Sequence, residues 1–156
     1  MRALRELEPP SDDEGFAQVE RAPFEQRPTP GRDAAGVLVA ARAIGADGWE
    51  AAVADAAPEA PHLVFDWRPD GHVDELAEAV GRLERLVTGP VDAAVCPHGG
   101  GPPVCWCRPP LPGLPLAFAR AHGVDPARST VLGTSPAHRT LAAALGADVV
   151  RLPRPG

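Results

Sequence analysis

Residues 91–107 are Val-Asp-Ala-Ala-Val-Cys-Pro-His-Gly-Gly-Gly-Pro-Pro-Val-Cys-Trp-Cys, a short apolar run followed by four side chains able to bind a metal ion. They are Cys96, His98, Cys105 and Cys107, and they include every cysteine of the chain. Three thiolates and an imidazole can form a tetrahedral Cys₃His shell, a typical structural zinc site. We therefore predict zinc in the loop 96–107. The alternative is buried cysteines with one disulfide, which an odd cysteine count fits poorly.

The segments around this loop alternate between strand and helix patterns. Short apolar runs predict strands at 62–67, 91–95, 130–132 and 148–152. Helical patterns, several of them ended by glycine or proline, predict helices at 33–44, 49–57, 74–87, 114–122 and 136–145. Continuous apolar strands separated by helices are typical of a parallel sheet covered on both faces. We expect an α/β fold, a Rossmann-like three-layer sandwich with a central parallel sheet and a zinc-binding loop.

The first 31 residues differ in composition from the rest. They are rich in proline and acidic residues and show no sustained periodicity, apart from one short candidate strand at 16–20. Such a composition buries too little apolar surface to order a segment by itself. We expect residues 1–31 to form a poorly ordered arm and residues 32–156 to form the α/β domain.

Charge and hydropathy limit the classes of function. The net charge is −6 and the charges are scattered, so we expect no nucleic-acid surface. No apolar run approaches the length of a membrane span, and no leading targeting segment is visible, so we expect no membrane association and a cytoplasmic location. All 15 basic residues are arginine, which excludes any mechanism that requires a lysine.

Three motifs follow one another in the second half of the chain. They are Cys-Pro-His after a strand, the segment Cys107-Arg108-Pro109-Pro110-Leu111-Pro112-Gly113, and Ala-Arg-Ser-x-x-x-Gly at residues 127–133. Over about residues 72–152 this order resembles a branch of the haloacid dehalogenase (HAD) superfamily. The branch contains D-glycero-D-manno-heptose 1,7-bisphosphate phosphatase and the phosphatase part of the histidinol-phosphate enzymes. The resemblance implies a HAD-like sheet with a structural zinc loop beside the active site.

The catalytic motifs of that family have poor counterparts here. The family has Asp-x-Asp after its first strand, a Thr or Ser closing the second, a Lys after the zinc loop, and Gly-Asp-x-x-x-Asp for Mg²⁺. For the first motif the best counterpart is Glu20-Arg21-Ala22-Pro23-Phe24, with Asp12-Asp13-Glu14-Gly15 as the alternative. At the other three positions the chain has, in order, Phe65 and Asp66, Pro109, and Thr134 and His138.

These differences bear on the expected function. Phosphoryl transfer to an aspartate needs the nucleophile, a proton donor and a divalent ion together. We therefore expect a HAD-like zinc-binding protein, a catalytically degenerate phosphatase homologue that acts as a binding or regulatory domain and does not use Mg²⁺. The alternative is a divergent phosphatase, a hydrolase acting on a sugar phosphate or similar monoester through unorthodox residues.

Three residues are candidates for ligand binding. The guanidinium of Arg108 is expected either to clamp a phosphate or carboxylate or to pack along the zinc loop. Thr134 and Ser135 precede a predicted helix, so their hydroxyls either cap it or contribute to an anion site at its N-terminus. The expected partner is a small phosphorylated or anionic ligand, with a protein partner as a further possibility.

Overall fold

The central feature of the computed structural model is a five-stranded parallel sheet in the order β3-β2-β1-β4-β5. The model describes residues 33–101 and 105–154. The strands are β1 (Val37–Ala40), β2 (His62–Trp67), β3 (Val91–Cys96), β4 (Thr130–Gly133) and β5 (Asp148–Arg151). The helices are α1 (Trp49–Asp55), α2 (Asp74–Glu84), α3 (Gly113–His122) and α4 (Pro136–Leu145), with 3₁₀ turns at Ala41–Ala43 and Pro126–Arg128.

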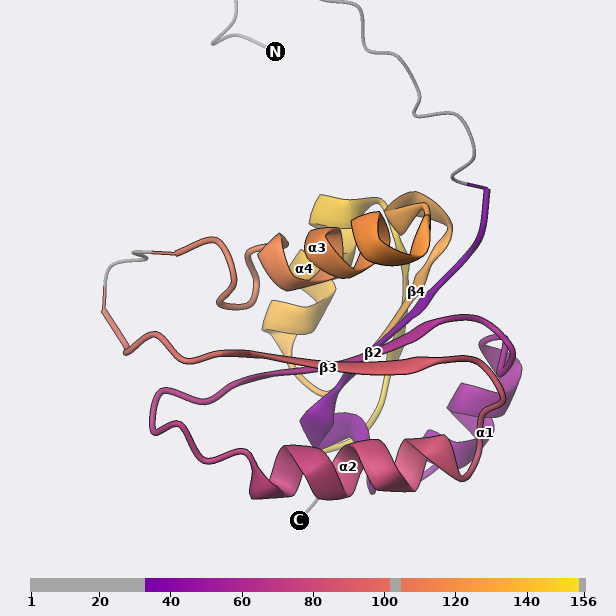
Figure 1. Cartoon of the computed structure of the whole chain (residues 1–156), viewed down its shortest axis with the longest axis horizontal. Helices are drawn as coiled ribbons and strands as arrows, with labels where there is room; N and C mark the ends of the chain where they lie inside the picture. Colours follow the sequence, from indigo (N-terminus) through magenta and orange to yellow (C-terminus); the bar gives the residue numbers. More distant parts are fainter. Residues whose placement is uncertain (1–32, 102–104, 155–156) are drawn as a thin grey trace, which may run out of the picture. The chain divides into compact units, whose positions relative to one another are not determined.

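The helices cover both faces of the sheet. Figure 1 shows α1 and α2 on one face and α3 and α4 on the other. This arrangement confirms the predicted α/β, Rossmann-like sandwich with a central parallel sheet. Within the described residues, no helix has the length and apolar character needed to span a membrane.

The chain divides into two units, Met1–Pro30 and Gly31–Gly156. All of the described residues belong to the second unit. The predicted arm 1–31, the candidate strand 16–20 and both candidate first motifs, at Asp12–Gly15 and Glu20–Phe24, lie outside the described residues and stay predictions.

The prediction of a helix over residues 33–44 is wrong. Val37–Ala40 form β1, which pairs with β2 on one side and β4 on the other, so it lies in the middle of the sheet. Only the last turn, Ala41–Ala43, is helical, and it is 3₁₀. The alanines favour a helix, but Val37, Leu38 and Val39 are at most 2% exposed because both faces of the central strand are covered. Burial at the centre of the sheet therefore overrides local helix propensity.

The first residue of β2 places a titratable group in the core. His62 is completely buried, and its Nδ1–H donates to the carbonyl of Ala60 over 2.7 Å. Within the described residues its Nε2 has no hydrogen-bond partner. Burial lowers the pKa of His62, opposed by that hydrogen bond and by the charge of Glu59. His62 is therefore held in its neutral form.

The last strand forms an open edge. β5 pairs with β4 alone among the described strands, and all four of its residues are exposed. Pro153 follows two residues after Arg151, and proline cannot donate to a strand ladder. The edge is thus limited to a short strand.

Candidate functional site

The order of the strands creates a site at their carboxyl ends. The chain runs outward from β1 through β2 to β3, and then returns to the other side of β1 as β4 and β5. In open α/β sheets a crevice lies where the order changes direction, outside the carboxyl ends of the strands. The segments that follow β1, β2 and β4 all line one cleft here, and β3 ends in the Cys/His loop. The two candidate sites are thus neighbours.

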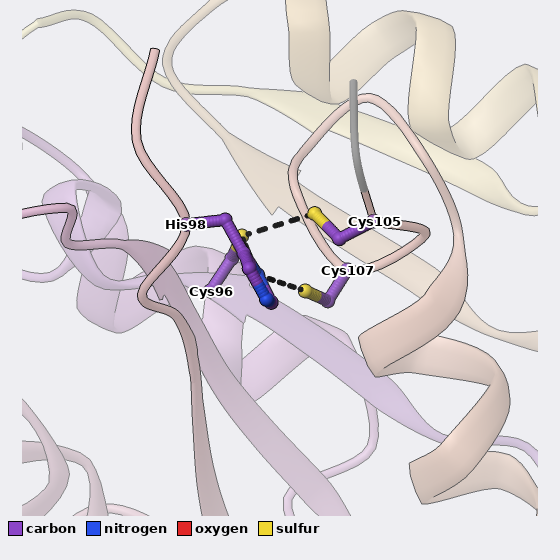
Figure 2. A group of neighbouring side chains, drawn as sticks. All are labelled: Cys96, His98, Cys105 and Cys107. Atoms are coloured by element: carbon purple, nitrogen blue, oxygen red, sulfur yellow. Dashed lines mark hydrogen bonds between the residues drawn. The ribbon is translucent and has the colours of Figure 1, made fainter. Parts of the chain in front are cut away.

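The four predicted metal ligands come together. Cys96 ends β3 and is completely buried, while His98, Cys105 and Cys107 lie in the loop that follows. Figure 2 shows the four side chains converging, and their ligand atoms all lie within 4.8 Å of one another. The Sγ of Cys96 lies 3.6 Å from the Nδ1 of His98 and 3.6 Å from the Sγ of Cys105. The Sγ of Cys107 lies 3.3 Å from the same Nδ1.

These distances fit one tetrahedral ion. With metal–sulfur bonds of about 2.3 Å and a metal–nitrogen bond of about 2.0 Å, ligand atoms around such an ion lie about 3.5–3.8 Å apart. The three measured contacts, at 3.3 and 3.6 Å, are near that range, and the remaining pairs lie within 4.8 Å. A disulfide would instead need the sulfurs about 2.05 Å apart, and the three cysteines are free. The cluster could therefore hold a metal ion with little rearrangement.

Thiol ionisation also favours a bound cation. Burial acts to raise the pKa of Cys105, but hydrogen bonds from the Cys107 thiol and from nearby backbone groups lower it to about 7. Burial, together with the sulfurs of Cys96 and Cys105, raises the pKa of Cys107 to about 12. Ionisation of the Cys105 thiol is therefore favoured, and ionisation of the Cys107 thiol is disfavoured. A divalent ion removes this conflict because it stabilises all the thiolates at once.

The second site is a cleft of about 610 Å³. Its walls come from the turn after β1, the end of β2, helix α2, the start of α4 and the C-terminal segment. The charged and polar residues that line it are Arg42, Asp66, Arg68, Glu75, Glu78, Arg82, Thr134, Ser135, His138 and Arg154. Among the described residues, Arg42 and Arg154 form no ion pair, and Arg82 lies over the Trp49 ring at 5.2 Å. The cleft is thus polar and is lined by several guanidinium groups.

One wall of the cleft is an ion-paired cluster. The guanidinium of Arg68 contacts Asp66 and Glu75, each over 2.6 Å. The side chains of Arg68 and Asp66 are only 12% and 13% exposed, so this pair is poorly screened by water. A second Asp66 oxygen accepts from the backbone N–H of Trp67 over 2.8 Å. The Asp66 side chain is therefore held in place through both of its oxygens.

His138, on the first turn of α4, is held in one tautomer. Its Nδ1 accepts a hydrogen bond from the backbone N–H of Thr134 over 3.1 Å, so in the neutral ring the proton is on Nε2. The ring packs edge-on against Phe65 and against the backbone of Gly133, where an added Cβ would overlap the His138 side chain. Burial lowers the pKa of His138, opposed by the charge of Asp66. His138 is thus a cleft residue whose neutral ring carries its proton on Nε2.

The three predicted ligand-binding residues fall in different places. Thr134 and Ser135 line the cleft. Ser135 is the N-cap residue of α4, but its hydroxyl makes no capping hydrogen bond, so the capping alternative is wrong for this residue. Arg108 is not among the cleft residues; its guanidinium donates to the carbonyls of Gly99 and Gly101 and lies 5.6 Å from the Trp67 ring. That geometry matches the loop-packing alternative, and a ligand contact by Arg108 stays a prediction.

Several cleft residues were not identified from the sequence. Arg42 follows β1 directly, and the wrong helix over 33–44 hid its position at the end of a central strand. Arg82 and Arg154 are distant in sequence from any motif. The available signal was the run Gly36-Val37-Leu38-Val39, because glycine before three branched apolar residues is also typical of a buried strand.

Comparison with known proteins identifies the fold. No family model matches the chain, and no curated protein matches it. Among solved structures, D,D-heptose 1,7-bisphosphate phosphatase from B. bronchiseptica, complexed with magnesium and phosphate, is similar, with a TM-score of 0.55, 19% identity, and coverage of 74% of this chain and 78% of that chain. A protein from Mesorhizobium loti described as a HAD-like phosphatase has a TM-score of 0.56, 21% identity, and coverage of 80% and 74%. The fold is HAD-like. This confirms the fold implied by the sequence resemblance.

Proposed function

We propose that this chain is a zinc-binding protein of HAD-like fold that binds a small phosphorylated or other anionic ligand and has lost phosphatase chemistry. The observation that carries the proposal is the set of residues at the strand ends. The residues after the central strand β1 are Ala41, Arg42 and Ala43, and those after β4 include Thr134 and His138. The family has Asp-x-Asp after its first strand and Gly-Asp-x-x-x-Asp for Mg²⁺. With β1 taken as that first strand, in place of the counterparts predicted at 20–24 and 12–15, four of these five positions hold carboxylates in the family.

The nucleophile, the acid–base group and the Mg²⁺ ligands of phosphoryl transfer are missing together, and the residues in their places cannot do the same chemistry. An alanine methyl can neither attack phosphorus nor move a proton, and Thr134 and His138 offer no carboxylate oxygen to Mg²⁺. Removing one catalytic acid, base or oxyanion donor commonly costs about 10²–10⁴ in rate. The loss of a nucleophile, an acid–base group and metal ligands together removes the reaction.

The same positions suit binding of an anion without a metal. Arg42 stands between the two alanines, and Arg154 lines the cleft as well. The Nε2–H of His138 is a neutral donor, and the hydroxyls of Thr134 and Ser135 lie on the same wall. Guanidinium and neutral donors together match phosphate and carboxylate oxygens.

We infer that the ion in the Cys₃His cluster is zinc. Three thiolates and one imidazole form a soft, four-coordinate set with no position left for substrate, which is typical of structural zinc. Cys96, His98, Cys105 and Cys107 would hold the ion, and its chemistry there is to close the loop and contribute to folding.

The second candidate is a divergent phosphatase. Asp66 favours it, because this carboxylate lines the cleft and its charge acts on His138. Against it, Asp66 is bound by Arg68 over 2.6 Å and by the Trp67 N–H, which lower its nucleophilicity.

The deciding experiment is release of phosphate from a panel of sugar phosphates with Mg²⁺, alongside calorimetric binding of the same compounds and of pyrophosphate. We expect no turnover above background, and salt-sensitive binding of at least one phosphorylated compound. Turnover that is lost in Asp66→Asn and kept in Asp70→Asn would establish the phosphatase instead. Protein that neither binds nor hydrolyses any phosphorylated compound would refute the anion proposal.

A further inference from the structure

The metal cluster and the cleft share a wall. In the register of β2 and β3, Trp67 pairs with Cys96, and the backbone N–H of Arg68 donates to the carbonyl of Cys96 over 2.9 Å. Trp67 and Arg68 both line the cleft, whereas Cys96 is a metal ligand. The end of β2 is therefore in direct contact with both sites.

The Trp67 side chain is held by the metal loop on several sides. Its indole Nε1–H donates to the carbonyl of His98 over 2.7 Å. Arg108, next to the ligand Cys107, lies over the ring at 5.6 Å. A Cβ at Gly100 would lie 3.9 Å from the ring, so the backbone of the loop also passes close by. These three contacts of the half-exposed indole all come from the Cys/His loop or from Arg108 next to it.

Arg108 in turn holds the loop itself. Its two guanidinium nitrogens donate to the carbonyls of Gly99 and Gly101 over 3.0 and 2.8 Å. Glycines have large conformational freedom, so this segment depends on such contacts and on the metal for a fixed shape. When His98 and Cys107 bind an ion, they fix both ends of the surface that contacts Trp67.

We propose that Trp67 couples the two sites: metal in the Cys₃His cluster fixes the cleft wall through Trp67, so that metal-loaded protein binds an anion more tightly than metal-free protein. The wall affected is the ion-paired cluster of Asp66, Arg68 and Glu75. The backbone N–H of Trp67 donates to Asp66, and the Arg68 guanidinium connects Asp66 to Glu75. Without metal, the ligand must itself order this wall, and that cost weakens binding. By linkage, the anion must also strengthen metal binding by the same factor.

The predicted change in anion affinity rests on the proposed anion-binding function. The predicted fixing of the cleft wall by metal does not. The first experiment therefore needs no ligand. Amide hydrogen exchange is measured for residues 65–68 with metal and after chelation, with residues 37–40 of β1 as the internal reference. We expect exchange at 65–68 to become about tenfold faster on chelation while β1 stays protected. Equal loss of protection in β1 would show global unfolding, and no change at 65–68 would show no coupling; either overturns the proposal.

The second experiment measures pyrophosphate affinity with and without metal in three proteins. In the unchanged chain, chelation should weaken binding about tenfold, within the usual range of coupling between two sites. Trp67→Leu should retain its metal, bind pyrophosphate as weakly as metal-free protein, and respond less than twofold to chelation. Trp106→Phe is the matched control, because Trp106 lies in the same loop, is 74% exposed, and is not a cleft residue; it should behave as the unchanged chain.

Trp67→Phe keeps the experiment decisive if the leucine variant loses its metal. Phenylalanine preserves a ring for Arg108 but has no N–H for the His98 carbonyl, so the metal effect on affinity should fall to about threefold. A metal effect as large as in the unchanged chain, in either Trp67 variant, overturns the role of Trp67. If no form binds pyrophosphate, the anion function fails, and hydrogen exchange at 65–68 in Trp67→Phe still decides the coupling.

Discussion

The Cys/His loop and the strand-end cleft are adjacent, yet they differ in how complete their chemistry is. The loop contains all four ligands that a tetrahedral ion needs, at separations close to those of a bound ion. The cleft has a volume of about 610 Å³ and a polar lining, and alanine, threonine and histidine stand at the strand ends. The loop therefore has a full set of ligands for one ion, whereas under the proposed function the cleft lacks the groups that phosphoryl transfer needs.

The difference has a physical reason. Metal binding in a structural site contributes directly to the free energy of folding, so its ligands are needed whether or not the protein has an activity. Clustered catalytic carboxylates do the opposite, because like charges held together at a partly buried site lower stability. Under the proposed loss of phosphatase chemistry, losing clustered carboxylates stabilises the chain, whereas losing the metal ligands destabilises it.

The largest expected effect is loss of the metal. His98→Gln should abolish stoichiometric metal binding and lower Tm by about 10 °C, since an ion present at a thousand times its Kd stabilises by about 4 kcal/mol. Metal content and differential scanning calorimetry measure both quantities. The matched control is His72→Gln, because the His72 side chain is 78% exposed and lies outside the cluster. A His98→Gln protein that keeps its metal and its Tm would contradict the metal site.

The packing of His138 against the backbone of Gly133 should contribute to the stability of the fold. In Gly133→Ala the new Cβ would overlap His138, whose Nδ1 would lie 2.7 Å away, so we expect a loss of about 1–3 kcal/mol in the free energy of unfolding. Gly81→Ala in α2 is the control, with its nearest atom 4.0 Å away; it should stabilise by about 0.5–1 kcal/mol. Urea unfolding measures both. Equal stability of the two variants would show that His138 is not packed as described.

Charge in the cleft should have a smaller, ligand-dependent effect. Arg42→Ala should weaken pyrophosphate binding about tenfold, the loss of one charge-assisted hydrogen bond, without changing metal content. Arg85→Ala, an exposed arginine at the end of α2, should leave the affinity unchanged. Calorimetric titration at two salt concentrations tests this. Equal effects of the two substitutions would show that the anion responds only to net charge.

The smallest expected effect concerns pH and lies away from both sites. Since burial lowers the pKa of His62 below its unfolded value, the unfolded chain binds the proton more readily. Stability is therefore complete above about pH 6.5 and falls as the pH drops through the region between the unfolded and folded pKa values. His62→Leu should reduce this slope and change stability at pH 8 by only about 1 kcal/mol. His138 acts in the same direction, so some slope should remain. An unchanged slope in denaturant unfolding across pH 5–8 would contradict this account.

Much of the fold follows from sequence pattern. The predicted strands at 62–67, 91–95, 130–132 and 148–152 correspond to β2, β3, β4 and β5, because each is a short apolar run bounded by proline, glycine or charge. The predicted helix 74–87 is real but ends three residues earlier, at Glu84; beyond it the Leu86 N–H donates to the carbonyl of Leu83, as in a 3₁₀ turn. The metal cluster was equally predictable, because its ligands are close in sequence.

The parts that were not predicted depend on contacts distant in sequence. The local signal for a strand at Val37–Ala40 is short and is surrounded by alanines that favour a helix; the strand form depends on β2 and β4 on either side. The cleft residues come from several separate segments that meet only in the folded sheet. Once β1 was missed, the residues after it could not be compared with the first motif of the family.

The open edge formed by β5 bears on how the protein behaves at high concentration. Among the described strands, one side of β5 is unpaired, and such an edge is a template for joining another chain; Val149 and Val150 expose apolar side chains there. Asp148 and Arg151 place a charge at each end of this four-residue strand, and Pro153 prevents it from growing longer. Short length, flanking charge and a following proline are the features by which proteins resist edge-to-edge aggregation. The C-terminal segment therefore protects solubility as well as lining the cleft through Arg154.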